Sequence, residues 1–216
     1  AGNAYVAGET FSESSTFPAA VGPDLTYNGG ADAFVAKVNA AGTALLYCGY
    51  IGGSGQEGAW DLALDGAGNA YIAGRTTSAS DLPTKVGPDL SSNGGTDAFV
   101  AKVNAGGSAL DYCGYIGGAG CDEALDSAVD GSGCAYVAGY TGSDSSSFPV
   151  KTGPDLTYNG AGDAFVVKVN ASGSALDYCG YIGGNDYEIA CAISIDAAGN
   201  AYVAGETFSE SSTFPA

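Results

Sequence analysis

The same nineteen letters, AGNAYVAGETFSESSTFPA, occupy positions 1–19 and positions 198–216 of this sequence. Two related phrases lie between them. AGNAYIAGRT begins at residue 67 and SGCAYVAGYT at residue 132, so successive copies are 66, 65 and 66 residues apart. A regular internal repeat is the signature of a chain built from tandem supersecondary units. The complete match returns only after three repeats, which indicates a larger unit of 197 residues.

This periodicity divides the chain into blade-like repeats. The first lacks its opening strand, and the fourth is the start of a further copy, identical to residues 1–19. The repeats are residues 1–66, 67–131, 132–197 and 198–216. Because the sequence begins in mid-motif and without Met, we expect it to be a processed piece or a window on something longer.

Each repeat contains four runs typical of β-strands. One set of four such runs is GAWDLALD (58–65), AYIAGRT (70–76), DAFVAKVN (97–104) and ALDYCGYIGG (109–118). Alternating side chains with Gly, Asn and Asp between the runs predict two hairpins. We therefore expect a four-stranded antiparallel sheet of about 65 residues, with a long loop between its second and third strands. No segment shows the periodicity of a helix.

Small residues crowd both faces of these predicted strands, which favours sheets packed face to face at a spacing of about 10 Å. The fold class is thus all-β, with tandem four-stranded antiparallel blades in a β-propeller-like arrangement. A β-solenoid is the rival, but its repeats are usually shorter, about 20–30 residues. Closed propellers have about four to eight blades. The sequence leaves open whether the blades form a closed ring or an open superhelical or fibrous array.

Three motifs resemble the SBBP repeat family, a bacterial and archaeal β-propeller repeat. They are DGAGNAYIAG from Asp65, the SFP of residues 147–149, and DAFVAK from Asp32. The YCGYIGG segment resembles the family's Y-S-T-Y-L-G-G, with Cys-Gly in place of Ser-Thr. This resemblance covers essentially the whole chain and implies an extracellular or cell-surface repeat protein. It implies no reaction, because the family has no shared catalytic residues.

Composition argues against several functions. The sequence has six Lys and Arg and 24 Asp and Glu, which gives a net charge of −18. This negative charge repels nucleic acid and anionic membrane surfaces. No apolar run approaches the roughly 20 residues that cross a bilayer, so we expect no membrane insertion. Without His or a CxxC motif, a Ser-His-Asp triad, c-type haem attachment and a standard zinc site are absent. We expect no enzyme activity and no cofactor.

Two further sites are weaker candidates. Calcium is conceivable at Asp65, Asp130 and Asp196, but each lies in a tight turn where Asp is favoured for local backbone bonding. Asn170-Ala171-Ser172 is a lone glycosylation sequon. The single Trp60 is expected in the core.

Six cysteines are candidates for disulfides or cross-links. Three occupy equivalent positions on the last strand of each repeat and three occur once each: Cys48, Cys113, Cys179, and Cys121, Cys134, Cys191. In a propeller the last strand is the outer edge, and equivalent positions in neighbouring blades lie beyond the ~7 Å Cα limit for a disulfide. Two interpretations remain: a small buried residue in place of Ser, or a covalent link to another copy or to a non-equivalent cysteine.

Half of the basic residues occupy one repeated position, namely Lys37, Lys102 and Lys168. Such a position indicates a paired, partly buried ammonium with a structural role. The acidic residues closest in sequence to these lysines fall on the other face of the predicted strand. We therefore expect the partners to be the repeated acids of the long loop, Asp24, Asp89 and Asp155.

These observations together predict a structural, self-associating extracellular protein, a surface fibre, filament or matrix component built from identical three-blade units. Its partners would be copies of itself, joined head to tail, with strand addition at the two ends as one mode. The alternative is a cell-surface adhesin that binds a glycan or protein through its long loops. The verbatim recurrence of GPDLTYNG at 22–29 and 153–160 favours the structural function.

Overall fold

The computed structural model describes residues 2–215, and within them the chain forms thirteen β-strands and no helix. The strands are β1 (Ala4–Thr10), β2 (Asp32–Val38), β3 (Leu45–Ile51), β4 (Glu57–Leu64), β5 (Ala70–Thr76), β6 (Asp97–Val103), β7 (Leu110–Ile116), β8 (Asp122–Val129), β9 (Ala135–Thr141), β10 (Asp163–Val169), β11 (Leu176–Ile182), β12 (Glu188–Ile195) and β13 (Ala201–Thr207). Residues 2–215 also contain no helix that is long and apolar enough to cross a bilayer.

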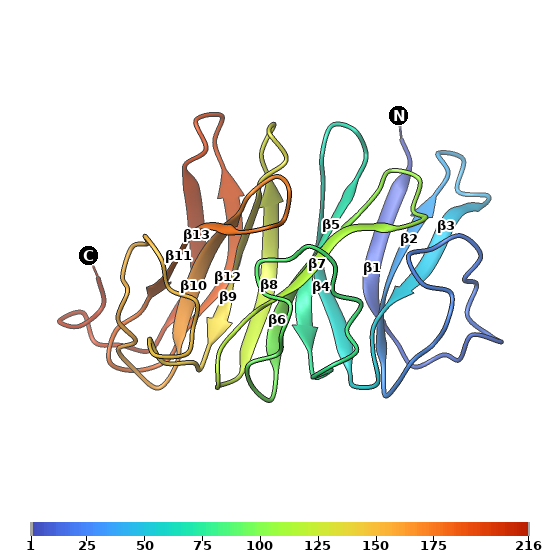
Figure 1. Ribbon diagram of the computed structural model, residues 1–216. Coiled ribbons are helices and arrows are strands. Elements are labelled where there is room, and N and C mark those ends of the chain that lie inside the picture. The colour runs from blue at the N-terminus through green and yellow to red at the C-terminus, as the bar shows by residue number, and fades with distance from the viewer. Residues whose placement is uncertain (1, 216) are drawn as a thin grey trace.

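The strands form four antiparallel sheets (Figure 1). The first sheet contains β1–β3, the second β4–β7, the third β8–β11 and the fourth β12–β13, each in chain order. Register is repeated as well as order: Thr10 lies opposite Asp32, just as Thr76 lies opposite Asp97. The sequence prediction of tandem four-stranded antiparallel sheets is confirmed in the second and third sheets.

The expected strands are close to the observed ones. In the second sheet the AYIAGRT strand has the expected bounds, and the other three differ by one or two residues at their ends. The tight turn between β4 and β5 places Gly68 at a φ of 86°, where a glycine avoids the steric cost of a side chain. The sequence repeat begins in this turn, so the first strand of each sheet comes from the preceding repeat.

The long loop of each repeat covers the free edge of the last strand. In the second sheet Lys85 forms an antiparallel bridge with Cys113, with N–H···O distances of 3.0 and 2.8 Å. Asp24 and Asp155 bridge Tyr50 and Tyr181 in the first and third sheets. The backbone groups of these edge strands are therefore partly paired, which reduces their tendency to pair with other chains.

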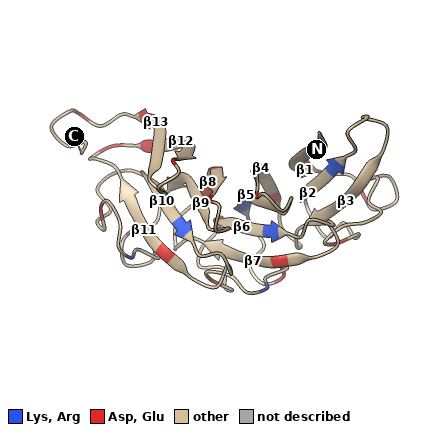
Figure 2. Ribbon diagram, turned by 90° about the horizontal axis from the view of Figure 1, so that it is seen from above, with Lys and Arg blue, Asp and Glu red and all other residues tan. Residues whose placement is uncertain are grey.

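The four sheets stand side by side in a crescent that does not close (Figure 2). The first strands β4, β8 and β12 lie toward its concave side, and β4 contacts β8, which in turn contacts β12. Asp61 on β4 accepts the backbone N–H of Ser127 on β8 at 2.9 Å. Asp126 on β8 accepts that of Ile193 on β12 at 2.6 Å.

Between the sheets, a tyrosine ring of one sheet lies against a turn glycine of the next. Gly107 follows β6 with φ 74°, and a Cβ at this position would overlap the ring of Tyr47 in the first sheet. Gly173 has the same relation to Tyr112. Gly42 is the equivalent glycine of the first sheet, with φ 70°, but nothing lies within 4 Å of its Cβ position. The glycine allows the close approach of the tyrosine ring of the preceding sheet.

This difference gives a matched pair of substitutions. Gly42→Ala and Gly107→Ala both place a Cβ in the left-handed region, at a cost of about 1–2 kcal/mol. Gly107→Ala also pushes a methyl group into the Tyr47 ring, which adds about 1–3 kcal/mol of overpacking. Urea unfolding at low protein concentration should thus show a clearly lower midpoint for Gly107→Ala. Equal midpoints would contradict the observed packing of the ring on the turn.

Candidate self-association surface

Each internal sheet buries both of its faces. Ile72, Phe99 and Cys113 of the second sheet pack in one cluster with residues of the first sheet. Tyr112 and Ile116, on the opposite face, pack with the third sheet. All five are at most 1% exposed. A sheet of this kind has no face adapted to water, so it is stable only between two neighbours.

The strands β1 and β13 have one sequence, AYVAGET, but opposite environments. In β1, Tyr5 is half-buried against the second sheet, whereas Val6 on the other face is 46% exposed. In β13, Val203 packs against the third sheet, and Tyr202 is 62% exposed. Each copy of the strand thus leaves open the face that the other one buries.

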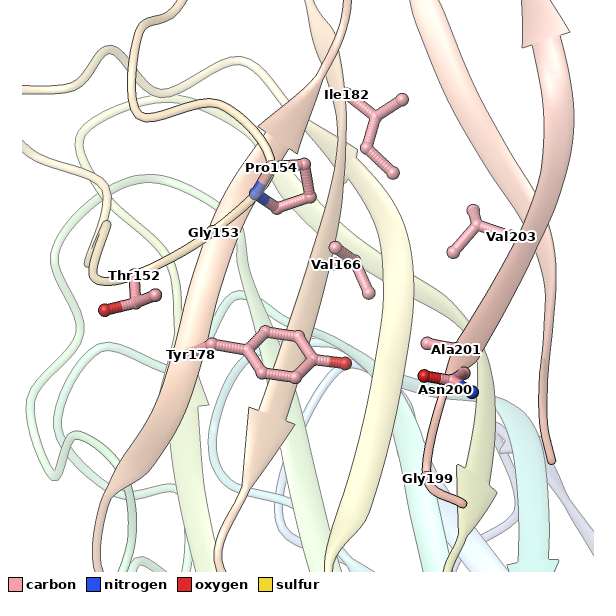
Figure 3. A pocket seen from close by; sticks show the side chains of 10 residues that line it. All are labelled: Thr152, Gly153, Pro154, Val166, Tyr178, Ile182, Gly199, Asn200, Ala201 and Val203. Atoms are coloured by element: carbon pink, nitrogen blue, oxygen red, sulfur yellow. The ribbon is translucent and has the colours of Figure 1, made fainter. Parts of the chain in front are cut away.

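A cavity of about 530 Å³ opens between the third and fourth sheets. Tyr178 and Ile182 belong to one wall, and Ala201 and Val203 to the other (Figure 3). The residues equivalent to Tyr178 in the first and second sheets are the almost fully buried Tyr47 and Tyr112. The fourth sheet comprises only β12 and β13 within residues 2–215, so β13 is paired on one side alone. The cavity lies where the third strand of a complete sheet would be.

The structure corrects the expected partners of the repeated lysines. Lys102 Nζ lies 4.9 Å from the centre of the Tyr71 ring, its neighbour on β5, and 3.9 Å from Asp65 in the β4–β5 turn. Lys168 repeats this arrangement with Tyr136 and Asp130, at 4.8 and 3.7 Å.

Lys37 lies 4.9 Å from the Tyr5 ring and donates to the carbonyl of Ala105 in the second sheet, at 3.3 Å. Aromatic faces and turn carboxylates therefore hold these ammonium groups, and Lys37 also links two sheets.

The acids expected to pair with these lysines, Asp24, Asp89 and Asp155, instead organise their own loops. Asp155 Oδ1 accepts the backbone N–H of Thr157 at 2.9 Å, and its Oδ2 accepts the Asn159 side-chain amide at 2.7 Å. Asp24 and Asp89 accept the amides of Asn28 and Asn93 in the same way, both at 2.8 Å. These bonds fix the conformation of the loop that covers the outer strand.

All six cysteines, which lie within residues 2–215, are free thiols, so the expected link between non-equivalent cysteines is not formed within the chain. Cys48, Cys113 and Cys179 are at most 2% exposed, which fits the interpretation of a small buried residue in place of Ser. The long loop covers the outer edge of their strands. Only Cys121 and Cys191 are exposed. Burial raises the pKa of the Cys113 thiol to about 12.

Trp60 does not lie in the core, which is where the sequence predicts it. Its side chain is 42% exposed, and the Arg75 guanidinium lies 5.5 Å from its ring centre. The sequence does carry a signal of this exposure. The equivalent positions of the other repeats hold no Trp, whereas a core position that recurs in every repeat would need a side chain of similar size each time.

A buried pair of carboxyl groups lies at each junction between sheets, a feature that the sequence analysis missed. At the junction of the third and fourth sheets, Asp163 and Glu188 both border Gly183, whose absent side chain leaves room for them. Asp163 Oδ2 accepts the N–H of Asn159 at 3.0 Å, whereas its Oδ1 is buried without a hydrogen-bond partner. Glu188 Oε2 accepts the N–H of Gly184 at 2.8 Å.

Burial and the neighbouring Glu188 carboxylate raise the pKa of Asp163 to about 6. The same two causes act on Asp32 beside Glu57, where the pKa is also raised to about 6. Of residues 2–215, no group of three or more His, Cys, Asp or Glu side chains is placed to hold a metal ion.

No protein-family model and no curated protein sequence matches the chain.

The burial of the repeated cysteines is testable with a thiol reagent at pH 8. The native protein should react rapidly at the two exposed thiols, Cys121 and Cys191, and slowly or not at all at the three repeated cysteines. Unfolding in guanidinium should expose all six. Rapid labelling of Cys113 in the native protein, located by peptide mapping, would contradict the covered edge.

The carboxyl pairs predict a pH dependence of stability. The pKa of Asp163 is raised from 3.8 to about 6 on folding. Its contribution to the free energy of unfolding is therefore complete below about pH 4 and is lost as the pH rises through about 6. Asp163→Asn replaces the ionisable group with a neutral amide. The stability of this variant relative to the native chain should therefore improve between pH 4 and pH 7.

The matched control is Asp111→Asn, at an exposed carboxylate. Thermal unfolding of the native chain and of both variants is compared across this pH range. The same pH dependence of stability for Asp163→Asn and the native chain would show that the buried pair does not titrate as described.

Proposed function

We propose that this protein is a structural, non-catalytic component of an extracellular fibre or filament, in which copies of the chain associate with one another head to tail. The single observation that carries the proposal is that an internal sheet buries both faces of its strands against neighbouring sheets, so a sheet of this composition needs a sheet on each side. Head-to-tail contacts of this kind form a ring where the rotation closes and an open array where it does not.

The arrangement of the sheets supports a β-propeller-like geometry in its open form. The first strands lie toward the concave side of a crescent, and the last strands toward its convex side (Figure 2). Face-to-face sheets with this orientation are the blades of a propeller or of a superhelical stack. The motifs that resemble SBBP repeats favour the same geometry and an extracellular location.

The second candidate is an adhesin that binds a glycan through the long loops. The observation in its favour is a polar cavity of about 440 Å³ beside the third loop, lined by Asp155, Asn159, Gly184 and Thr213 among others. A carbohydrate would be bound there through amide and carboxylate hydrogen bonds. Binding to a glycan array by a chain that stays monomeric would favour this candidate.

The structural proposal is tested by substitution at the exposed face of β13. The native protein should form filaments above a threshold concentration, seen by negative-stain electron microscopy and light scattering. Tyr202→Asp should abolish them, because Tyr202 is 62% exposed and would become buried on association. Reductant should leave association through the sheet faces intact and would remove only links formed through the exposed Cys121 and Cys191.

Leu90→Asp is the matched control, since Leu90 is 53% exposed in the second long loop, away from the faces of the sheets. It should leave the filaments intact. A native protein that remains monomeric at all concentrations would contradict the proposal.

A further inference from the structure

We propose that the junction between the second and third sheets binds a neutral carbohydrate on the concave side of the crescent. Three groups form this site: the Trp60 ring on β4, the Arg75 guanidinium on β5 and the Glu123 carboxylate on β8. All three belong to internal sheets of one chain, so the inference does not depend on self-association.

The two internal sheets differ most on the strand that lies toward the concave side (Figure 2). The last strands β7 and β11 have the same sequence, LDYCGYI, and β6 differs from β10 only by Ala101 in place of Val167. In contrast, only Ala59, Asp61 and Ala63 of β4 are matched at the equivalent positions of β8. Since both sheets fold with different first strands, the other side chains of β4 are not dictated by the fold alone.

A β-bulge on each first strand directs one side chain away from the ladder. The pairing of β4 with β5 skips Trp60, which lies between the paired residues Ala59 and Asp61. The third sheet has the same bulge at Leu125. A bulge leaves its extra residue unpaired and changes the direction of the side chain. Trp60 is 42% exposed, and it is the only exposed aromatic side chain in the second and third sheets.

The Trp60 ring is held in place although it is exposed. The ring lies against Gly58, where an added Cβ would be 2.8 Å from two of the ring carbons. The Arg75 guanidinium, whose residue is opposite Gly58 in the ladder, lies 5.5 Å from the ring centre. An aromatic ring whose orientation is already fixed loses little conformational entropy when a ligand stacks on it.

An ion pair across the junction orients the polar groups beside the ring. Arg75 Nη1 donates to Glu123 Oε1 at 3.2 Å, and the two side chains are 36% and 25% exposed. A guanidinium has several N–H donors and a carboxylate has a second acceptor oxygen, so this one hydrogen bond leaves both groups able to bind a ligand.

These groups fit a neutral sugar better than a charged ligand. The face of an indole ring is negative, so the C–H groups of a sugar ring stack on it, while the hydroxyl groups bond to a guanidinium and a carboxylate. The net charge of −18 repels an acidic polysaccharide. A cationic ligand would compete with the Arg75 guanidinium, which already lies beside the ring.

The small size of the apolar surface argues against a protein partner. A specific protein interface buries about 800 Å² on each partner and has an apolar centre. On the strands of the second and third sheets, the other exposed large apolar side chain is Leu64, at the last position of β4. One isolated ring with polar neighbours therefore suits a single sugar unit.

The fluorescence of Trp60 reports on this site directly, because it is the only tryptophan. Titration of the native protein with cellohexaose, chitohexaose and mannohexaose should give a saturable change of emission with at least one of these neutral sugars, and polygalacturonate should give none. A response to polygalacturonate alone, or to none of the sugars, would overturn the proposal. A response to a peptide library and to no sugar would instead identify a protein interface.

The third sheet supplies substitutions that the fold tolerates, since it has Leu125 in place of Trp60 and Tyr140 in place of Arg75. With the sugar that binds, calorimetry should show an affinity about 10-fold or more lower for Trp60→Leu and for Arg75→Tyr. Their urea unfolding midpoints should remain close to that of the native chain.

Asn159→Ala is the control, because Asn159 lines the polar cavity beside the third long loop. This variant should bind the sugar as the native chain does. If Asn159→Ala loses binding and Trp60→Leu keeps it, the sugar binds at the loop and the proposal is overturned.

Discussion

The burial of both faces of each internal sheet is the constraint on which this structure depends. Antiparallel sheets in many soluble proteins keep one face for water and show a polar and an apolar set of side chains on alternate positions. Here both sets are apolar or small: on β6, Phe99 belongs to one buried cluster and Val100 to the other. A single sheet of this composition has no face adapted to water, so it needs a neighbouring sheet on each side.

Specific contacts fix how one sheet lies on the next. The Tyr47 ring rests on Gly107, and the Tyr71 hydroxyl donates to the carbonyl of Gly133 at 3.2 Å. On the concave side, Asp61 accepts a hydrogen bond from the backbone of β8, which is the first strand of the next sheet. Apolar burial alone is non-directional. These hydrogen bonds and close approaches recur at successive junctions and so give the row of sheets a constant geometry.

The sequence predicted the strands and their pairing because these follow from local chemistry. A period of two with Gly and Asn at the turns determines a hairpin within a few residues, as in the turn before Ala70. The position of the cysteines on the last strand was also predicted, but their environment was not. Cys113 is buried in the cluster between the first and second sheets, and the edge of its strand is covered by a loop bridge from Lys85, a contact across 28 residues that no local pattern encodes.

The partners of the lysines were missed for a related reason. Alternation along β6 shows which face carries Lys102, but not that Tyr71 on the adjacent strand lies directly opposite it. A recurring signal was present, since each repeat pairs one such Tyr with one such Lys. The carboxyl pairs join residues of two different sheets, Asp163 and Glu188, and the sequence alone gives no register between sheets.

The most direct test of the account is electron cryo-microscopy of the native protein in its assembled state, at a resolution that separates strands. The account predicts one continuous row of four-stranded sheets, in which the junction between copies has the same spacing and the same tyrosine-on-glycine contact as the junctions within a copy. A boundary at which the row is interrupted, or a particle that closes on itself without such a junction, would contradict it.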